Sequence, residues 1–363
     1  MGRDLIRRFW HAPRVTLDAD GSQVPSLQPV DTTTAAFVGE HSPGQFDRPI
    51  LVTNARSLSR SFGSARCRLV AAAHHFFANG GARLYLLPVA DFEDDPGAAF
   101  AGLDEIDDFS LLASPGHGSC AAIEAGGRYC ERRADCFFLA DSPADAGPEA
   151  VRSLVEGLGV RSSYAALYVP WLNSESPAPA SAFVAGVLAR NPVWHVPAGS
   201  VLRGANGLAH SLSDSDGASL DALGVNALRT SRTGEVAVGA SQTLAPPTQA
   251  EWRYVSVRRT FIFLEHSIDK GTQWAVFEPN AEPLWSSLRR SIGAFLETQW
   301  RSGAFQGADA DEAYFVRCDR TTMTQADIDA GIVNVVVGFA PVKPAEFVVL
   351  RIGLKAARED PDP

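Results

Sequence analysis

Lysine is nearly absent from this chain of 363 residues: Lys270, Lys343 and Lys355 are its only lysines among 32 basic residues. Acidic residues number 42, so the formal net charge is −10, which argues against a general binder of nucleic acid or of anionic membranes. Arginine makes forked contacts with carboxylates and therefore suits fixed protein–protein contacts. A GC-rich genome would produce the same bias, so both explanations stay open.

Cysteines are few, and long apolar runs are missing. The five cysteines form neither a CxxC pair nor a disulfide framework, which indicates synthesis in a reducing cytoplasm. They are Cys67, Cys120, Cys130, Cys136 and Cys318. No apolar stretch approaches the ~20 residues that a membrane span needs. Residues 1–14 lack the apolar segment and small-residue cleavage site of a signal peptide, so we expect no membrane insertion.

The motifs of nucleotide and metal chemistry are missing as well. The chain has no phosphate-binding loop of the GxxxxGK type, no GxGxxG turn after a strand and no HExxH pair. The eight histidines show no ligand spacing, and the adjacent His74 and His75 would point about 100° apart on a helix. We therefore expect no cofactor and no metal ion.

One short glycine loop, 116–119, carries the only hint of catalysis. Its sequence GHGS places His117 and Ser119 two residues apart, which faintly resembles a protease histidine loop. No GxSxG nucleophile turn accompanies it. A cytosolic α/β hydrolase that uses Ser119 or a cysteine together with His117 is the alternative function to the one developed below.

The remaining pattern predicts a globular protein of two domains with extended arms. Hydrophobic residues make up 45% of the chain, enough to bury a core. Residues 1–30 form a proline-interrupted arm, and 31–245 alternate strands with helices, which indicates a mostly parallel sheet covered on both faces. The expected strands are 35–39, 50–53, 83–89, 109–113, 136–140 and 165–169, and the expected helices are 66–78, 119–127, 148–158 and 181–190. Residues 203–222 are expected to form a loop, followed by a hairpin over 225–238.

Residues 246–344 form the second predicted domain, of class α+β. Apolar residues at helical spacing predict a helix over 257–271, closed by Lys270 and Gly271. A further helix follows Pro283, and a short one runs from an N-cap at Thr324 to residue 330. The expected strands are 273–277, 313–318, 333–339 and 346–352, and residues 345–363 form a linking strand and tail.

Short apolar strands stand at both ends of the chain, at 15–17 and 347–352. Strands on arms outside a folded domain suit β-augmentation, in which one subunit completes the sheet of another through main-chain hydrogen bonds. Ordinary edge strands that pair within the chain would show the same pattern, and pattern alone does not separate the two. Four of the seven tryptophans lie close together in sequence. They are either anchors of the core or residues of an interface. The four are Trp252, Trp274, Trp285 and Trp300.

Several segments together resemble one protein family. They are 251–259 (EWRYVSVRR), 265–268 (EHSI), 270–280 (KGTQWAVFEPN), 315–319 (FVRCD) and 341–347 (PVKPAEF). The match runs from about 224 to 353 and continues more thinly upstream, at 76–81 (FFANGG) and 185–190 (AGVLAR). The chain resembles the contractile tail sheath proteins of phages, R-type pyocins and extracellular contractile injection systems.

The resemblance implies a structural subunit and not an enzyme. Such subunits stack as rings around an inner tube on a baseplate, below terminator or cap proteins, and contract from a metastable extended state to drive the tube through a target envelope. It implies assembly in the bacterial cytoplasm, then a place in a phage virion or a released tail-like particle. A tube or terminator protein of such a particle would be smaller. The larger domain is expected to have subtilisin-like topology and to face outward.

The resemblance also implies assembly residues. Neighbouring subunits would exchange terminal strands; the strand residues are Val15, Thr16, Leu17, Phe347, Val348, Val349, Leu350 and Ile352. Independently of the resemblance, the paired arginines on helix faces predict inter-subunit salt bridges at Arg258, Arg259, Arg289 and Arg290. The short acidic helix with Thr324, Asp327 and Asp329 is expected to face the tube. The expected partners are further copies of the chain and the tube, baseplate and cap proteins, with no nucleic acid.

Overall fold

The computed structural model describes residues 15–17, 23–41, 48–63, 67–342 and 348–355. The chain divides into two compact units, one of residues Val30–Phe263 and one of Met1–Pro29 together with Leu264–Pro363. The division falls inside helix α8 (Val255–Gly271), later in the sequence than the prolines at 246–247 where the sequence suggests a boundary.

The first unit is built on an eight-stranded, mostly parallel sheet in the order β12-β11-β8-β7-β6-β3-β5-β4. Its parallel strands are β3 (Thr34–Glu40), β5 (Arg83–Val89), β6 (Leu111–Ala113), β7 (Phe137–Asp141), β8 (Ala165–Val169) and β11 (Val225–Thr230). The edge strands β4 (Ile50–Val52) and β12 (Val236–Val238) run antiparallel to their neighbours. Every residue of β7 and β8 is buried, because the sheet is covered on both faces.

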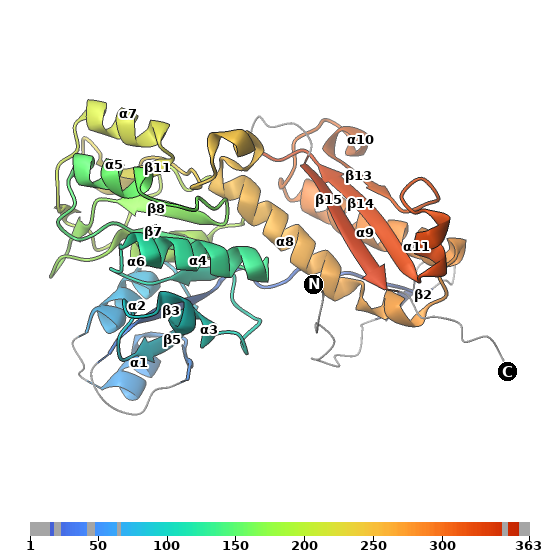
Figure 1. The fold of residues 1–363 in the computed structure, drawn as a ribbon, viewed down its shortest axis with the longest axis horizontal. Helices are drawn as coiled ribbons and strands as arrows, with labels where there is room; N and C mark the ends of the chain where they lie inside the picture. Colours follow the sequence, from blue (N-terminus) through green and yellow to red (C-terminus); the bar gives the residue numbers. More distant parts are fainter. Residues whose placement is uncertain (1–14, 18–22, 42–47, 64–66, 343–347, 356–363) are drawn as a thin grey trace. The chain divides into compact units, whose positions relative to one another are not determined.

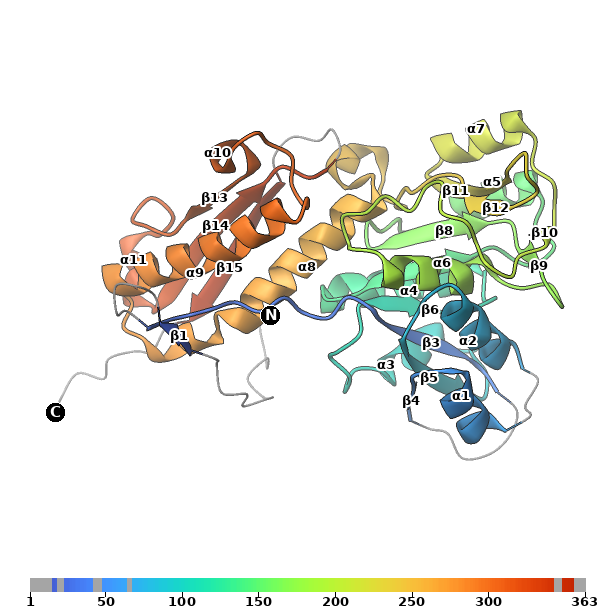
Figure 2. The ribbon, with the colours of Figure 1, turned by 180° about the vertical axis from the view of Figure 1, so that it is seen from behind.

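Helices lie on both faces of this sheet, as the alternating pattern predicts (Figures 1 and 2). Helices α2 (Arg68–Ala78) and α6 (Ala180–Arg190) pack together on one face, and α4 (Cys120–Arg133) lies on the other with α3 (Pro96–Ala101). Helix α6 is buried from Ala180 to Ala189, where it packs against the strands β6 and β7 and against the neighbouring helix α2. The remaining elements are α1 (Ala55–Phe62), α5 (Pro148–Glu156), β9 (Leu172–Asn173), β10 (Gly207–Leu208), α7 (Asp214–Ala222) and η1 (Pro247–Trp252).

Helices α2 and α6 approach each other so closely at Gly186 that no side chain fits there. A β-carbon on Gly186 would lie closer than 3.0 Å to the carbonyl oxygen of Phe76 and to Asn79. Asn79 is fully buried at the end of α2, where its side-chain nitrogen donates to the carbonyl of Arg203 (3.0 Å) and its oxygen accepts from the Arg203 amide (2.8 Å). A glycine is therefore required for the close approach of the two helices.

The second unit holds the three-stranded antiparallel sheet β13 (Tyr314–Arg317), β14 (Ile332–Phe339) and β15 (Val348–Lys355). Helix α9 (Glu282–Arg301) packs against β13 and lies on one face of the sheet (Figure 2). Val333, Val335 and Val337 alternate inward along the central strand β14, so one face of it is buried. The unit also contains α10 (Ala310–Ala313), α11 (Gln325–Asp329) and the hairpin of β1 (Val15–Leu17) and β2 (Gln23–Pro25).

Two predicted elements are wrong. Residues 273–277 form a 3₁₀ helix, η2 (Gln273–Phe277), because the amide of Ala275 bonds locally to the carbonyl of Thr272 (2.9 Å). The expected loop 203–222 contains α7, which starts at a capping box between Ser213 and Asp216. Glycine and serine are typical of loops, so the composition of this segment predicts a loop, although the capping box stabilises the first turn of a helix.

Candidate assembly interface

The C-terminal strand β15 pairs with β14 along its whole length in the isolated chain. The antiparallel register runs from Ile332 opposite Lys355 to Phe339 opposite Val348. Of the residues predicted for strand exchange, Val348, Val349, Leu350 and Ile352 lie in this ladder, and Phe347 lies outside the described residues. The last strand also continues to Lys355, three residues further than the apolar pattern predicts.

The N-terminal strand β1 contains the predicted residues Val15, Thr16 and Leu17 and pairs with β2 in an antiparallel hairpin. Sequence reasoning missed β2, although Val24 before Pro25 gave a weak β signal. In the second unit β2 lies near α9, and Leu27, which follows β2, is buried against Gly271. Both terminal strands therefore occupy places within a single chain, which is the arrangement of ordinary edge strands.

Arg258 is a buried side chain and not a surface cation. Its guanidinium carbon lies 3.5 Å from the ring centroid of Trp252 and 4.4 Å from that of Tyr164. It also donates a hydrogen bond to the Ser163 hydroxyl. Only 5% of Arg258 is exposed, because the aromatic rings enclose it. The sequence suggests an ion pair across subunits for Arg258, and burial among these rings does not suit that role.

Arg259 is also buried, with 3% exposure, and faces the carbonyls of Leu188 (3.4 Å) and Thr32 (3.5 Å). Burial lowers the pKa of its guanidinium to about 10. A buried guanidinium cannot meet a carboxylate of another subunit. We therefore restrict the inter-subunit ion-pair hypothesis to Arg289 and Arg290.

Arg289 and Arg290 lie on helix α9 with more of their surface in solvent. Arg289 already pairs with Glu282 within the chain, at 2.7 Å, and donates to the carbonyl of Cys318. Arg290 is exposed.

Among the tryptophans of this unit, Trp285 is 2% exposed and donates to the side chain of Asn280 (2.8 Å), which makes it a core anchor.

The short acidic helix α11 begins as the sequence predicts. Thr324 is its N-cap and forms a capping box with Asp327, whose backbone amide donates to the threonine hydroxyl at 3.2 Å. The backbone amide of Thr324 (2.8 Å) and its hydroxyl (2.7 Å) both donate to the Asp327 carboxylate and hold the pKa of that group below its ordinary value. Thr324 and Asp329 are exposed, and Asp329 accepts from Gln325 at 2.8 Å. The helix thus presents negative charge whose position is fixed by these hydrogen bonds.

The loop of the hydrolase alternative does not form a catalytic triad. Glu93 accepts from the Ser119 hydroxyl (2.7 Å) through one oxygen and contacts His117 Nδ1 (3.0 Å) through the other. The serine is therefore bonded to the carboxylate and not to the histidine, and its oxygen also caps α4 by accepting from Ala122. A cavity of about 290 Å³ lies beside His117, and Ser119 is not among the described residues that line it.

Cysteines give the alternative no better support. The thiol of Cys67 lies 3.3 Å from Nδ1 of His41 and so contacts a different histidine from the one that the sequence suggests. Within the described ranges no group of three or more histidine, cysteine, aspartate or glutamate side chains is placed to hold a metal ion. In the same residues, none of the helices combines the length and apolarity needed to cross a membrane.

Asp141, which sequence reasoning missed, organises the carboxyl end of the parallel sheet. It is fully buried at the end of β7 and accepts from the amides of Gly116 (3.0 Å) and Ser181 (2.8 Å) and from the Ser181 hydroxyl (2.6 Å). Burial raises its pKa to about 6 even though these donors act in the opposite direction. The carboxylate joins the loop after β6 to the start of α6.

The stability of the chain should depend on pH through this group. Its pKa is higher in the folded state than the ordinary 3.8, so its contribution is fully present below pH 3.8 and is lost as the pH rises through about 6. For the Asp141→Asn variant, urea denaturation should show a smaller free energy of unfolding than for the unmodified chain. We expect that gap to widen by about 2 kcal/mol from pH 7 to pH 4.5. A gap that is constant or narrows on acidification would contradict the assignment.

Comparison with known proteins gives concordant results at two levels. Residues 248–355 match the family model of the phage tail sheath C-terminal domain. No curated protein sequence matches the chain. Solved structures match nearly all of it, so the likeness includes the parallel sheet of the first unit.

Three of these structures belong to contractile particles. The helical sheath of the anti-feeding prophage in its contracted state is 30% identical, with a TM-score of 0.75 over 95% of this chain and 99% of that one. The sheath complex of PVC, an extracellular contractile injection system, in its contracted state is 27% identical, with a TM-score of 0.80 over 95% and 98%. A chain of the anti-feeding prophage baseplate is 29% identical, with a TM-score of 0.76 over 95% and 99%. The chain therefore belongs to the contractile tail sheath protein family.

Proposed function

We propose that this chain is the structural subunit of a contractile sheath, which polymerises as stacked rings around an inner tube and contracts from a metastable extended state. The observation that carries the proposal is the match to the anti-feeding prophage helical sheath, which extends over 95% of the chain. The energy for contraction comes from the difference between two packings of the same subunits, because the sequence offers no nucleotide-binding motif. The role is mechanical and requires no catalytic residue.

The partners follow from this role. Further copies of the chain form the polymer, an inner tube lies inside it, and baseplate and cap proteins close its ends. Assembly takes place in the bacterial cytoplasm, and the finished subunit is part of a phage virion or of a released tail-like particle. The domain of residues 31–245, with its mostly parallel sheet and subtilisin-like topology, faces outward, and residues 246–344 form the domain nearest the tube. The helix α11 faces that tube with Asp327, Asp329 and its N-cap Thr324.

Strand exchange would connect the subunits. In the isolated chain β15 fills the free edge of β14 with a register of eight residue pairs. Main-chain hydrogen bonds depend on strand geometry and not on which chain supplies the strand, so the same ladder can form with β15 of a neighbour. The hairpin of β1 and β2 offers a second strand at the other end of the chain. Such ladders on arms keep subunits connected while they rotate against each other.

Ion pairs on α9 would add contacts between subunits. Arg289 is 31% exposed at its side chain, and its present partner Glu282 is 63% exposed. An exchange of that carboxylate for one of another subunit leaves the number of ion pairs unchanged, so it changes the free energy by no more than about 1 kcal/mol. We propose that Arg289 and Arg290 set the orientation of neighbours and that the strands supply the strength of the contact.

Deleting residues 345–363, which removes β15, should leave a folded subunit that forms no long tubes. The matched control is deletion of 356–363, which keeps all of β15 and should polymerise like the full chain. Deletion of residues 1–20, which removes β1, should also prevent long tubes. Negative-stain electron microscopy detects the ridged tubes, and circular dichroism verifies the fold of each variant.

The outcomes separate strand exchange from the sheath role. Normal tubes from both deletions would reject strand exchange but leave the sheath role intact. A full-length chain that stays monomeric, with or without an inner tube present, would reject the sheath role itself.

A further inference from the structure

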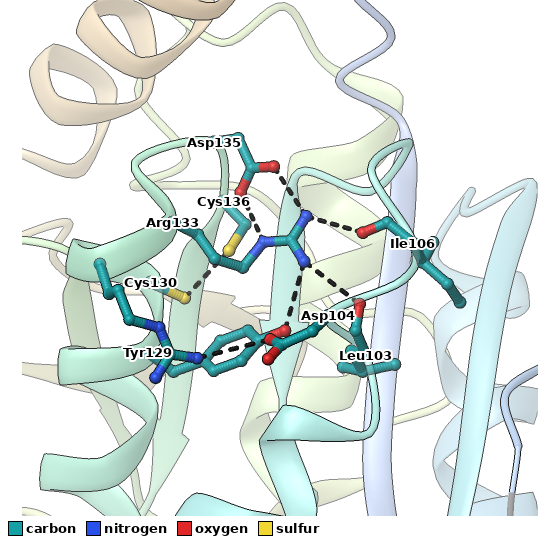
Figure 3. A network of polar contacts seen from close by, with 9 residues as sticks. Leu103, Asp104, Ile106, Tyr129, Cys130, Arg133, Asp135 and Cys136 are labelled. Atoms are coloured by element: carbon teal, nitrogen blue, oxygen red, sulfur yellow. Dashed lines mark hydrogen bonds and ion pairs between the residues drawn. The ribbon is translucent and has the colours of Figure 1, made fainter. Parts of the chain in front are cut away.

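Two buried thiols meet where helix α4 ends and strand β7 begins. The sulfur atoms of Cys130 and Cys136 lie 3.3 Å apart, and both residues are fully buried (Figure 3). The chain reverses between them at Ala134, which adopts a left-handed conformation (φ 60°) at the C-cap of α4. The separation is only roughly 1.2 Å longer than the ~2.05 Å of a disulfide bond.

We propose that Cys130 and Cys136 are a latent disulfide, which a low-molecular-weight disulfide closes when the end of α4 opens. One protein thiol attacks the small disulfide, forms a mixed disulfide and releases one small thiol, which takes up the proton. The second protein thiol attacks the mixed disulfide and releases the other small thiol in the same way. The protein dithiol is thereby oxidised, and the small disulfide is reduced to two thiols.

A polar network around Arg133 covers this pair (Figure 3). The guanidinium forms two parallel bonds to Asp135, of 2.8 and 2.7 Å. It also donates to the carbonyls of Leu103 (3.2 Å) and Ile106 (2.7 Å), which lie in the segment after α3. The network thus fastens that segment to the last turn of α4. We infer that it limits the access of an oxidant to the two sulfur atoms.

The chemistry of the thiols favours protection in the closed state. Burial, the contact with Cys130 and the charge of Asp135 all raise the pKa of the Cys136 thiol well above its ordinary value. The thiolate is the attacking species in exchange, so the folded pair reacts slowly until the turn opens. A particle released from the cell would pass from a reducing to an oxidising medium. That setting rests on the proposed function, whereas the test below concerns the isolated protein alone.

The experiment exposes the full-length chain to oxidised glutathione in urea below the unfolding transition, followed by alkylation of the remaining thiols in strong denaturant. We expect a peptide pair joined through Cys130 and Cys136 and lighter by two hydrogen atoms, with Cys318 alkylated. Closure should also raise the thermal midpoint by roughly 5 °C. Mixed disulfides with glutathione at either position without closure, or two alkylated thiols after the opening has been verified by hydrogen exchange, would overturn the proposal.

The variant Arg133→Lys tests the protective network, because lysine keeps the charge but loses the forked bonds. It should close the disulfide roughly tenfold faster without urea. The matched control is Arg132→Lys in the same turn. The Arg132 side chain is 63% exposed, and its ion pair with Asp104 is long, at 3.4 Å. Equal rates for the two variants would reject the protective role. Closure in urea remains the test of the disulfide even if Arg133→Lys folds poorly.

Discussion

Replacing Gly186 by alanine is expected to lower the free energy of unfolding by about 4 kcal/mol. The added methyl group would meet the carbonyl oxygen of Phe76 and the buried Asn79, both at less than 3.0 Å. A flexible side-chain tip could move away, but a helix backbone cannot, so α2 and α6 would have to separate. That movement would also strain the two hydrogen bonds between Asn79 and Arg203. Urea denaturation followed by circular dichroism measures the loss.

The sign of this effect is informative because local propensity predicts the opposite. In a helix interior alanine is more favourable than glycine by about 1 kcal/mol. Gly293 in α9 is the matched control, since nothing lies within 4 Å of its added β-carbon. Gly293→Ala should therefore stabilise the chain by about 0.5–1 kcal/mol. Similar changes for the two variants would contradict the packing of α2 against α6.

Local patterns of the sequence were sufficient to predict most elements of the fold. Segments 83–89 and 165–169 are rich in apolar residues, and the structure places each inside a mostly parallel sheet, with a strand on either side of it. Helices α8 and α9 are found where the apolar spacing and the terminal signals at Gly271 and Pro283 predict them. Apolar spacing and helix-end signals involve residues that are close in sequence, so they can be recognised without knowledge of the tertiary structure.

The run 273–277 has the composition of a strand, but local hydrogen bonds make it the 3₁₀ helix η2, and Phe277 is left 74% exposed. Other misjudged features depend on residues far apart in sequence. Arg258 reads as a surface cation until Tyr164, 94 positions earlier in the chain, and Trp252 enclose it. The contact of Glu93 with Ser119 likewise joins two separate loops. No local pattern reports such contacts, because the tertiary fold brings their members together.

Replacing Arg133 by alanine is the second large loss that we expect, about 4 kcal/mol. Its side chain and that of Asp135 are 11% and 15% exposed, so removal of the cation leaves a carboxylate in a place with little water. The carbonyls of Leu103 and Ile106 lose the bonds from the guanidinium as well, although that of Leu103 keeps the amide of Ile106 as a donor. The guanidinium also lies 4.6 Å from the ring centroid of Phe109, a contact that alanine cannot replace. Arg132→Ala, the exposed control, should change stability by less than about 1 kcal/mol.

A double-mutant cycle divides this loss into its parts. If the stranded carboxylate accounts for much of the damage, Arg133→Ala with Asp135→Ala should be more stable than Arg133→Ala alone, by about 1–2 kcal/mol. The remaining loss would then belong to the two carbonyls and the ring contacts, which Asp135 does not share. Strictly additive single losses would show that Asp135 contributes nothing to holding Arg133. The arginine would then fasten the segment after α3 through the neutral carbonyls of Leu103 and Ile106 alone.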